Sequence, residues 1–242
     1  MPINPIRFFL VFIVYIGTLV VLAFIVINLL RRNLKNRLNQ IFTSFFIFLA
    51  IGIILNSIYL LFSDANFSLI ASFLNILSMY FSCVSGGFLL LYIFILLLPK
   101  VMRKLKFQTL FMLIYLGIYI PIFFIPYGIG IEILPNGTQL SPVWSLGLTI
   151  FLLILLSTQL LLILIISINV YKKFNTNILA EKFKFFVIGV IFLYYIPIGV
   201  TITNYLNIQL LRIIFGFTAP IIIVGLILIY YGIGKPINIK VS

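Results

Sequence analysis

Two series of uncharged polar residues recur at intervals of three, four and three positions inside strongly apolar segments. At about 100° per residue, each series would occupy an arc of about 80° on one face of a helix. Such a stripe can hydrogen-bond a ligand, or it can hydrogen-bond across a helix interface, where small and hydroxyl-bearing residues are common. The first series is Asn75, Ser78, Ser82 and Ser85, and the second, in which one position is a proline, is Tyr194, Pro197, Thr201 and Asn204. Further uncharged polar residues in apolar segments are Asn56, Tyr59, Tyr119, Gln159 and Thr218.

Ionisable side chains are almost absent from the same apolar segments. No Asp, Glu, Lys or His lies inside them, and the chain contains no histidine at all. Ionisable groups within a membrane usually mark proton relays, ion pathways and catalytic sites, and histidine is the commonest metal ligand. We therefore expect no enzyme, no metal site and no cofactor, and the last apolar segment lacks the lysine that a retinal Schiff base requires. Arg212, at the end of that segment, is expected to extend to lipid headgroups, with an anion contact in a pocket as the alternative.

The composition is that of an integral membrane protein. Of the 242 residues, 64% are hydrophobic and 8% are charged, whereas a soluble domain typically carries about 25% charged residues. The formal net charge of +13 does not indicate nucleic-acid binding, because the basic residues fall in short intervals between apolar segments, where such charges set membrane orientation. We therefore expect the lipid bilayer, and no nucleic acid, as a partner.

Seven apolar segments are long enough to cross a bilayer, which takes about 20 residues in a helix. The first, 8–30, is too long for the core of a signal peptide and ends before Arg31 and Arg32, which indicates a retained helix. Because an open sheet cannot satisfy its edges in lipid, the sequence predicts an all-α membrane protein, a single domain over 1–242 folded as a seven-helix bundle. The predicted helices are 8–30, 41–62, 68–98, 107–127, 145–170, 186–206 and 211–231.

Basic residues distinguish the two sides of this bundle. With seven helices, fourteen of the sixteen Lys and Arg residues fall on one side, and only Arg7 and Arg212 fall on the other. Positive charge favours the cytoplasmic side, so we expect the N-terminus outside, the C-terminus in the cytoplasm, and a multi-pass protein of the cell membrane. The basic intervals would also be the surface on which a cytoplasmic signalling partner docks. The residues expected there are Arg31, Arg32, Arg103, Lys104, Lys172 and Lys173.

One outer connection, residues 130–144, is long enough to form structure of its own. Pro135, Asn136 and Gly137 give a turn signal, because proline presets φ and glycine accepts positive φ. The flanking residues can extend, so we expect a short outer β-hairpin between the fourth and fifth helices. It would cover the outer mouth of the bundle as a lid, with Glu132, Asn136 and Trp144 as its functional residues.

Polar residues and prolines concentrate in the outer halves of the predicted helices, while the cytoplasmic halves are almost entirely apolar. Prolines in spanning helices free carbonyl groups and open local cavities. This bias with depth predicts an outward-facing pocket between helices three to seven, for a small molecule or a lipid. Helix packing alone is the alternative explanation of each polar stripe. The pocket candidates are Asn75, Ser78, Ser82, Tyr119, Gln159, Tyr194, Thr201 and Thr218.

Several short stretches, together with the topology, resemble one broad group of proteins. The stretches are 39–42 (NQIF), 74–78 (LNILS), 142–145 (PVWS) and 230–234 (YYGIG). The whole pattern resembles the seven-helix sensor regions at the N-termini of bacterial and archaeal histidine kinases, and free-standing archaeal seven-helix proteins of similar length. This resemblance implies a receptor-like input module. Because eleven residues follow Tyr231, we expect no output domain on the chain and a signal that passes to a separate partner.

Two other functions stay open on the sequence. A small facilitator or transporter also fits seven helices and this length, but a repeated transporter fold places matching prolines in both halves. Here the spanning prolines are Pro121, Pro126, Pro197 and Pro220, with none in the first three helices. A non-catalytic membrane subunit or scaffold fits as well.

Overall fold

The computed structural model describes residues 9–32, 35–61, 68–102, 104–125, 129–133, 140–174 and 177–234. Within these ranges seven helices are long and apolar enough to cross a membrane, as predicted. Helices suit lipid because they satisfy their backbone polar groups within each segment. The spans are Ile13–Arg32, Arg37–Tyr59, Ser68–Leu97, Leu105–Phe123, Leu146–Tyr171, Leu179–Leu206 and Gln209–Ile233.

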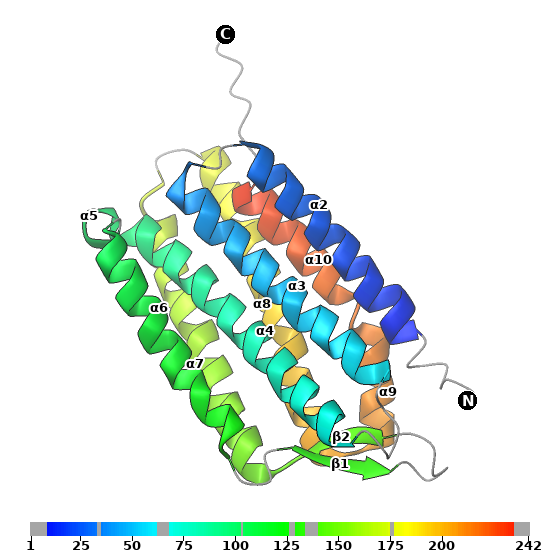
Figure 1. The fold of residues 1–242 in the computed structure, drawn as a ribbon. Helices are drawn as coiled ribbons and strands as arrows, with labels where there is room; N and C mark the ends of the chain where they lie inside the picture. Colours follow the sequence, from blue (N-terminus) through cyan, green and yellow to red (C-terminus); the bar gives the residue numbers. More distant parts are fainter. Residues whose placement is uncertain are drawn as a thin grey trace.

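The elements follow one another along the chain as Figure 1 shows. The first span is η1 (Phe9–Tyr15) continued by α2 (Ile16–Arg32), and the next two are α3 (Arg37–Leu61) and α4 (Ser68–Leu97). After the short α5 (Pro99–Met102), α6 (Leu105–Tyr119) ends in a 3₁₀ turn, η3 (Ile120–Phe123). Strands β1 (Ile129–Ile133) and β2 (Leu140–Trp144) precede α7 (Leu146–Tyr171) and α8 (Asn177–Leu206). The last span consists of α9 (Gln209–Thr218), α10 (Ile221–Ile229) and η4 (Tyr230–Gly234).

Six helices close into a ring in the described part of the bundle. Around the ring, α2 packs on α3, α3 on α4, α4 on α7, α7 on α8, α8 on α10, and α10 back on α2. The fourth span, α6, stands outside this ring at one side of the bundle and packs mainly against α4 (Figure 1). The ring, without α6, therefore encloses the centre of the bundle.

Two glycines set a close crossing between α8 and α10. A Cβ atom at Gly189 of α8 would lie 2.6 Å from the carbonyl oxygen of Gly225 in α10, and one at Gly225 would lie 3.0 Å from that of Gly189. The two backbones approach this closely because both positions lack a side chain, as at many helix interfaces in membranes. The pair holds α8 firmly against the last span.

Large apolar side chains fill the half of the bundle that is remote from the strands. The rings of Phe42 in α3 and Tyr92 in α4 have their centroids 4.9 Å apart, a separation at which aromatic pairs attract. Around them, several side chains of four helices have no exposed surface. These are Phe45, Phe46, Leu89, Ile93, Phe186, Leu226 and Ile229. Together they form an apolar layer across the bundle.

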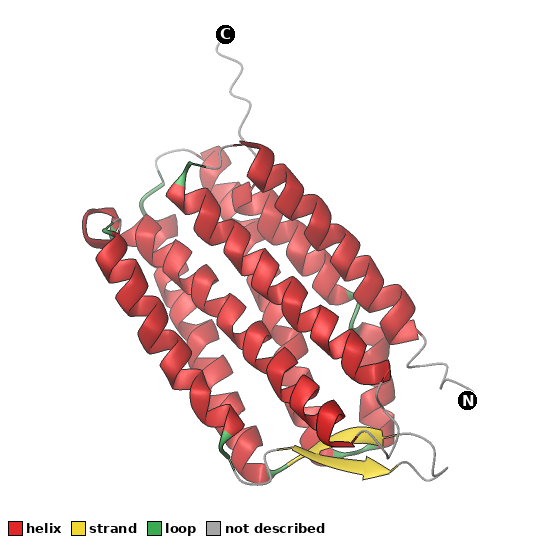
Figure 2. Ribbon diagram, viewed as in Figure 1, coloured by secondary structure: helices red, strands yellow, loops and turns green. Residues whose placement is uncertain are grey.

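Strands β1 and β2 pair antiparallel at one end of the bundle, with Ile129 opposite Trp144 and Ile133 opposite Leu140 (Figure 2). Both strands contact α4, and β2 also contacts α8. The connecting residues 134–139, with the predicted turn, lie outside the described residues. We call this end the strand end and the opposite one, where the described lysines and arginines other than Arg212 lie, the basic end. That the strand end faces the outside stays a prediction from the charges.

The seventh span differs from the single helix predicted over 211–231. It begins at Gln209 and breaks after Thr218, so that α9 and α10 are separate helices. Pro220 causes the break because it has no N–H to donate to the carbonyl of Gly216. That carbonyl accepts instead from the N–H of Ala219, at 3.4 Å.

Other predicted boundaries are displaced at the helix ends. α8 begins at Asn177 rather than near 186, so Lys182 and Lys184 lie on a helix instead of in a loop. Apolar runs mark only the part of a helix that suits lipid, whereas lysine and arginine are good helix formers and extend a helix beyond that part. In the same way α3 begins at Arg37 rather than near 41. The fourth span ends at Phe123 rather than at 127.

Candidate ligand cavity

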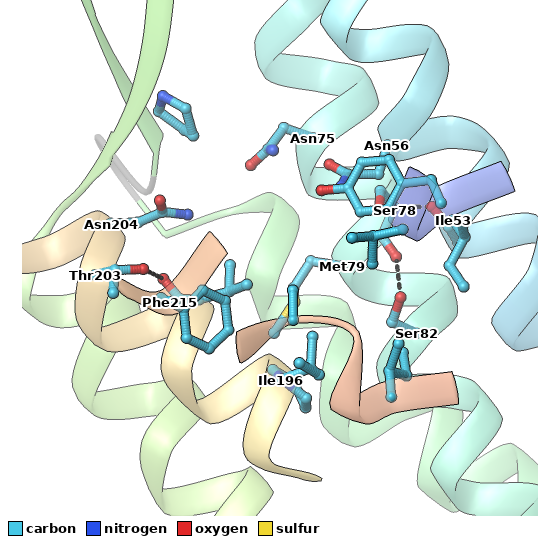
Figure 3. A pocket seen from close by; sticks show the side chains of 18 of the residues that line it. Ile53, Asn56, Asn75, Ser78, Met79, Ser82, Ile196, Thr203, Asn204 and Phe215 are labelled. Atoms are coloured by element: carbon cyan, nitrogen blue, oxygen red, sulfur yellow. Dashed lines mark hydrogen bonds between the residues drawn. The ribbon is translucent and has the colours of Figure 1, made fainter. Parts of the chain in front are cut away.

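A cavity of about 510 Å³ occupies the strand end of the bundle, within the range of about 300–1,000 Å³ typical of small-molecule sites. Its wall is formed by η1, α2, α3, α4, α7, α8, α9, α10 and β2. Figure 3 shows Asn75 of α4 directed into the cavity, with Thr203 and Asn204 of α8 on the other side of it. Along α4 the described wall runs from Asn75 to Gly86, so the cavity ends before the apolar layer begins.

The cavity differs from the predicted location between helices three to seven. Its wall includes Val14 and Thr18 of the first span and Gly52 and Asn56 of the second, and no described residue of α6. The cause is the position of α6 outside the ring, since only ring helices can face the centre of the bundle. The first two spans belong to the ring and therefore replace the fourth.

Five of the eight predicted pocket residues line this cavity, and so does Trp144, one of the three predicted lid residues. Of the other lid residues, Glu132 pairs through its backbone with Ser141 in the β1–β2 register. The side chain of Glu132, and all of Asn136, lie outside the described part of the chain. The five lining residues are Asn75, Ser78, Ser82, Gln159 and Tyr194.

The structure places the other three predicted pocket residues, Tyr119, Thr201 and Thr218, away from the described wall. Tyr119 lies behind it, and its hydroxyl donates to Oε1 of Gln159 at 3.2 Å. The hydroxyl of Thr201 donates to its own helix, to the carbonyl oxygen of Pro197 at 2.7 Å. Thr218 is exposed. Helical periodicity predicts which residues share a face, but the direction of that face depends on packing.

The serines of the α4 stripe are hydrogen-bonded within the helices. Ser78 Oγ donates to the carbonyl oxygen of Gly52 at 2.7 Å, which links α4 to α3. Ser82 Oγ donates to the carbonyl oxygen of Ser78 at 2.9 Å, as the dashed line in Figure 3 shows, and Ser85 Oγ donates to that of Ser82 at 2.6 Å. For these serines, helix packing is a sufficient explanation, even though they line the cavity.

Four other side chains on the wall carry a buried polar atom that has no hydrogen-bond partner in the described structure. These atoms are Asn75 Oδ1, Trp144 Nε1, Gln159 Nε2 and Tyr194 Oη. A buried polar atom without a partner costs about 1–3 kcal/mol, and native proteins contain few of them. Their gathering on the wall of one cavity indicates a site for a molecule that hydrogen-bonds them.

Gln159 is held in place from behind by α6. Tyr119 Oη donates to Gln159 Oε1, and Tyr115 Oη, 3.4 Å from Tyr119 Oη, donates to the carbonyl oxygen of Cys83 at 3.1 Å. With its oxygen bonded to Tyr119, the amide turns Nε2 toward the other side. Tyr119 and Gln159 were predicted as separate pocket residues, because nothing in the sequence connects two residues that lie 40 positions apart.

Gly86 forms the floor of the cavity below Gln159 and Tyr194. A Cβ atom at this position would lie 2.7 Å from Tyr194 Oη and 2.9 Å from Gln159 Cδ, and it would meet Gln159 Nε2. Any side chain at position 86 would therefore collide with these two polar atoms and displace them. Gly86 was not among the predicted site residues, and its only sequence signal is its place directly after the polar stripe that ends at Ser85.

Arg212 lies on the cavity wall at the strand end, so its expected extension to lipid headgroups is wrong. Its Nη1 donates to Ser141 Oγ at 2.6 Å, and its Nη2 donates to the carbonyl oxygen of Pro142 at 2.9 Å. The chain reaches α9 through Asn207, whose φ of 53° is a left-handed conformation that asparagine tolerates better than most residues. Through its hydrogen bonds to Ser141 and Pro142, Arg212 fastens β2 over the cavity.

The expected docking residues that the structure describes all lie at the basic end. Arg31 and Arg32 end α2, Lys104 precedes α6, and Lys172 and Lys173 follow α7, while Arg103 lies outside the described residues. A hydrogen bond at this end, which the sequence did not predict, links α3 to the start of α6. Arg37 Nε donates to Gln108 Oε1 at 2.8 Å, and Gln108 Nε2 donates to the carbonyl oxygen of Met102 at 2.8 Å. The only sign of this link in the sequence was Gln108, a glutamine inside an apolar segment.

No protein-family model matches the chain, and no curated protein matches it in sequence. The fold and the cavity alone therefore define the class of protein. It is a seven-helix, multi-pass membrane protein with a partly polar cavity at one end of its bundle.

Proposed function

We propose that this protein is a receptor-like or sensory membrane protein, which binds a small-molecule or lipid ligand in the cavity and signals to a separate cytoplasmic partner. The observation that carries the proposal is that four unpartnered polar atoms, on Asn75, Trp144, Gln159 and Tyr194, all belong to side chains that line one cavity. With the strand end outside, as the charges predict, the ligand enters from the outside or from the outer leaflet.

The apolar layer beyond the cavity supports sensing rather than transport. Phe45, Leu89 and Phe186 have no exposed surface, and they fill the bundle on the basic side of Gly86. A polar solute would lose its hydrogen bonds on crossing this layer, at a cost of about 2–7 kcal/mol for each uncharged polar group. A ligand held at the closed end of the cavity acts instead through the helices that it contacts.

We assign transmission of the signal to α8. This helix contributes Tyr194 to the cavity and continues to the basic end, where Lys182 and Lys184 lie within its first three turns. Its crossing with α10 at Gly189 lies between these two regions. A ligand shifts an equilibrium only by the difference in its affinity for two states, and hydrogen bonds to Tyr194 would favour one position of α8. The partner would read that position at the basic end.

A transporter is the second candidate, and the break in the seventh span favours it. Gly216, Ala219 and Ile222, which surround the break between α9 and α10, all line the cavity. Discontinuous helices form the substrate and ion sites of many secondary transporters.

The test combines ligand capture with partner crosslinking. Native mass spectrometry of the protein from its own membranes would detect a bound molecule, in the wild type and in the Gln159→Leu/Tyr194→Phe double variant. A photo-crosslinking amino acid at Lys173 would report contacts at the basic end, with Leu210, an exposed residue of α9 at the strand end, as the control position. We expect a co-purifying molecule that the double variant loses, and a crosslinked protein at Lys173 whose yield changes with that loss.

Two other outcomes would overturn the receptor function. Uptake of the co-purifying molecule into proteoliposomes would establish the transporter instead. The absence of any bound molecule, together with equal crosslinking in the wild type and the double variant, would show that the cavity binds no ligand and that no signal reaches the basic end.

A further inference from the structure

Two hydrogen-bond donors lie side by side on the cavity floor. Gln159 Nε2 and Tyr194 Oη have no partner in the described structure, and their side chains are 4% and 3% exposed. Both atoms pack directly against Gly86, where even a Cβ atom would meet Gln159 Nε2 and lie 2.7 Å from Tyr194 Oη. Because both lie within 3 Å of that one position, the two donors are close enough together to bind a single ligand atom.

The hydrogen bonds behind the floor determine what it offers. The hydroxyl of Tyr119 donates to Oε1 of Gln159, so the amide faces the cavity with its NH₂ group, which can only donate. The hydroxyl of Tyr194 also has a proton to donate. Two converging donors suit an oxygen acceptor, whose lone pairs can receive both hydrogen bonds.

The charges of the wall favour an uncharged oxygen at this point. Among the described wall residues the only cationic side chain is Arg212, which is bonded to Ser141 and Pro142 at the strand end. Burying an ionised carboxylate without a paired cation costs far more than burying a hydrogen-bonded carbonyl or hydroxyl group. The floor is well removed from that end, since Gly86 lies eleven residues beyond Asn75 on α4 (86 − 75), about 16 Å at 1.5 Å per residue.

Apolar side chains make up much of the wall between the floor and the strand end. They come from four different helices: Leu49, Ile53, Met79, Ile196, Ile213 and Phe215. We infer that the ligand is an elongated, mostly apolar molecule that carries an uncharged carbonyl or hydroxyl oxygen at its inner end, and that Gln159 and Tyr194 bind this oxygen above Gly86. This inference rests on the proposed ligand-binding function and specifies the chemistry of the ligand.

The single tryptophan, Trp144, lines the cavity, so its fluorescence reports occupancy directly. Methyl nonyl ketone and undecane, which have the same number of carbons, serve as matched probes in nanodiscs, with each affinity corrected for partition into the lipid. The wild type should prefer the ketone by about tenfold, as expected for two buried hydrogen bonds to one oxygen. Gln159→Leu and Tyr194→Phe should each reduce this preference several-fold, and the double variant should abolish it while undecane still binds.

Tyr195→Phe provides the matched control. Tyr195 neighbours Tyr194 but is half-exposed, and its hydroxyl lies 2.7 Å from that of Thr218, away from the cavity. This variant should keep the full preference for the ketone. Equal affinity of the wild type for both probes, or a preference that survives in the double variant, would overturn the inference while leaving a ligand-binding cavity in place. Binding of neither probe would overturn the proposed function as well.

Discussion

Two buried glutamines allow the argument for the cavity to be tested through stability. The side chains of Gln159 and Gln108 are 4% and 2% exposed. Gln108 is hydrogen-bonded at both ends of its amide, to Arg37 and to the carbonyl oxygen of Met102, whereas the amide nitrogen of Gln159 has no partner in the described structure. Replacing each glutamine by leucine, which is similar in size, should therefore have unequal effects on the free energy of unfolding.

The expected magnitudes follow from the hydrogen bonds. Gln108→Leu loses two of them, one from a charged guanidinium, which should lower the free energy of unfolding by about 2–4 kcal/mol. Gln159→Leu loses the bond from Tyr119, at about 1 kcal/mol because the Tyr119 hydroxyl can turn to Tyr115 Oη 3.4 Å away, but relieves the cost of the unpartnered Nε2, about 1–3 kcal/mol. Without added ligand, Gln159→Leu should therefore raise the free energy of unfolding by about 0–2 kcal/mol. Binding sites often carry such a cost in stability.

The single cysteine supplies the assay. Cys83 is 1% exposed, so its reaction with a thiol-reactive fluorophore during heating reports unfolding. At about 2–4 °C per kcal/mol for a chain of this size, Gln108→Leu should lower the transition temperature by about 4–16 °C, and Gln159→Leu should leave it unchanged or raise it. If both variants lose the same stability, the amide nitrogen of Gln159 is hydrogen-bonded after all, and the reasoning from unpartnered atoms fails.

Three further predictions concern the floor, the strand end and the membrane orientation. Gly86→Ala should lower the free energy of unfolding by about 1–3 kcal/mol through overpacking, and it should block binding of methyl nonyl ketone. Gly117→Ala is the control: nothing lies within 4 Å of the added Cβ atom, so this variant should raise the free energy of unfolding by about 0.5–1 kcal/mol. Thermal unfolding measures both changes, and equal effects would contradict the floor geometry. Arg212→Leu should speed hydrogen exchange of the β2 amides, because two hydrogen bonds of 2.6 and 2.9 Å are lost; unchanged exchange would show that strand pairing alone holds β2. Gln209→Cys should react with an impermeant thiol reagent on intact cells and Lys173→Cys only after lysis, and the reverse pattern would invert the topology.

Hydropathy located the spans because it acts on each segment separately. The segment predicted over 68–98 corresponds to α4, Ser68–Leu97, and all seven apolar runs became helices. The errors lie where a helix continues past its apolar part, as at Arg37, and where Pro220 removes one backbone donor inside a long apolar run. At these points the hydrogen bonds of the backbone, and not the average apolarity, decide where a helix ends.

The polar residues show what sequence patterns could not resolve. Ser78 and Gln159 were both predicted to line the pocket, but Ser78 is hydrogen-bonded to Gly52 of the neighbouring helix and Gln159 keeps an unpartnered donor. Arg212 was expected at the lipid headgroups, yet it holds β2 through Ser141. In each case the outcome depends on a residue from another element, which no local pattern contains.

The sequence by itself determined seven helices, a bundle with two chemically unlike ends, and the concentration of polar residues toward one of them. Only the tertiary structure decided that six helices form a ring, that α6 stands outside it, and that two donors meet above Gly86. The physical reason is that lipid tails are as apolar as the helices, so the hydrophobic effect does not choose which helices pack together. Small residues and hydrogen bonds between distant positions make that choice, such as the bond between Tyr119 and Gln159 across 40 residues.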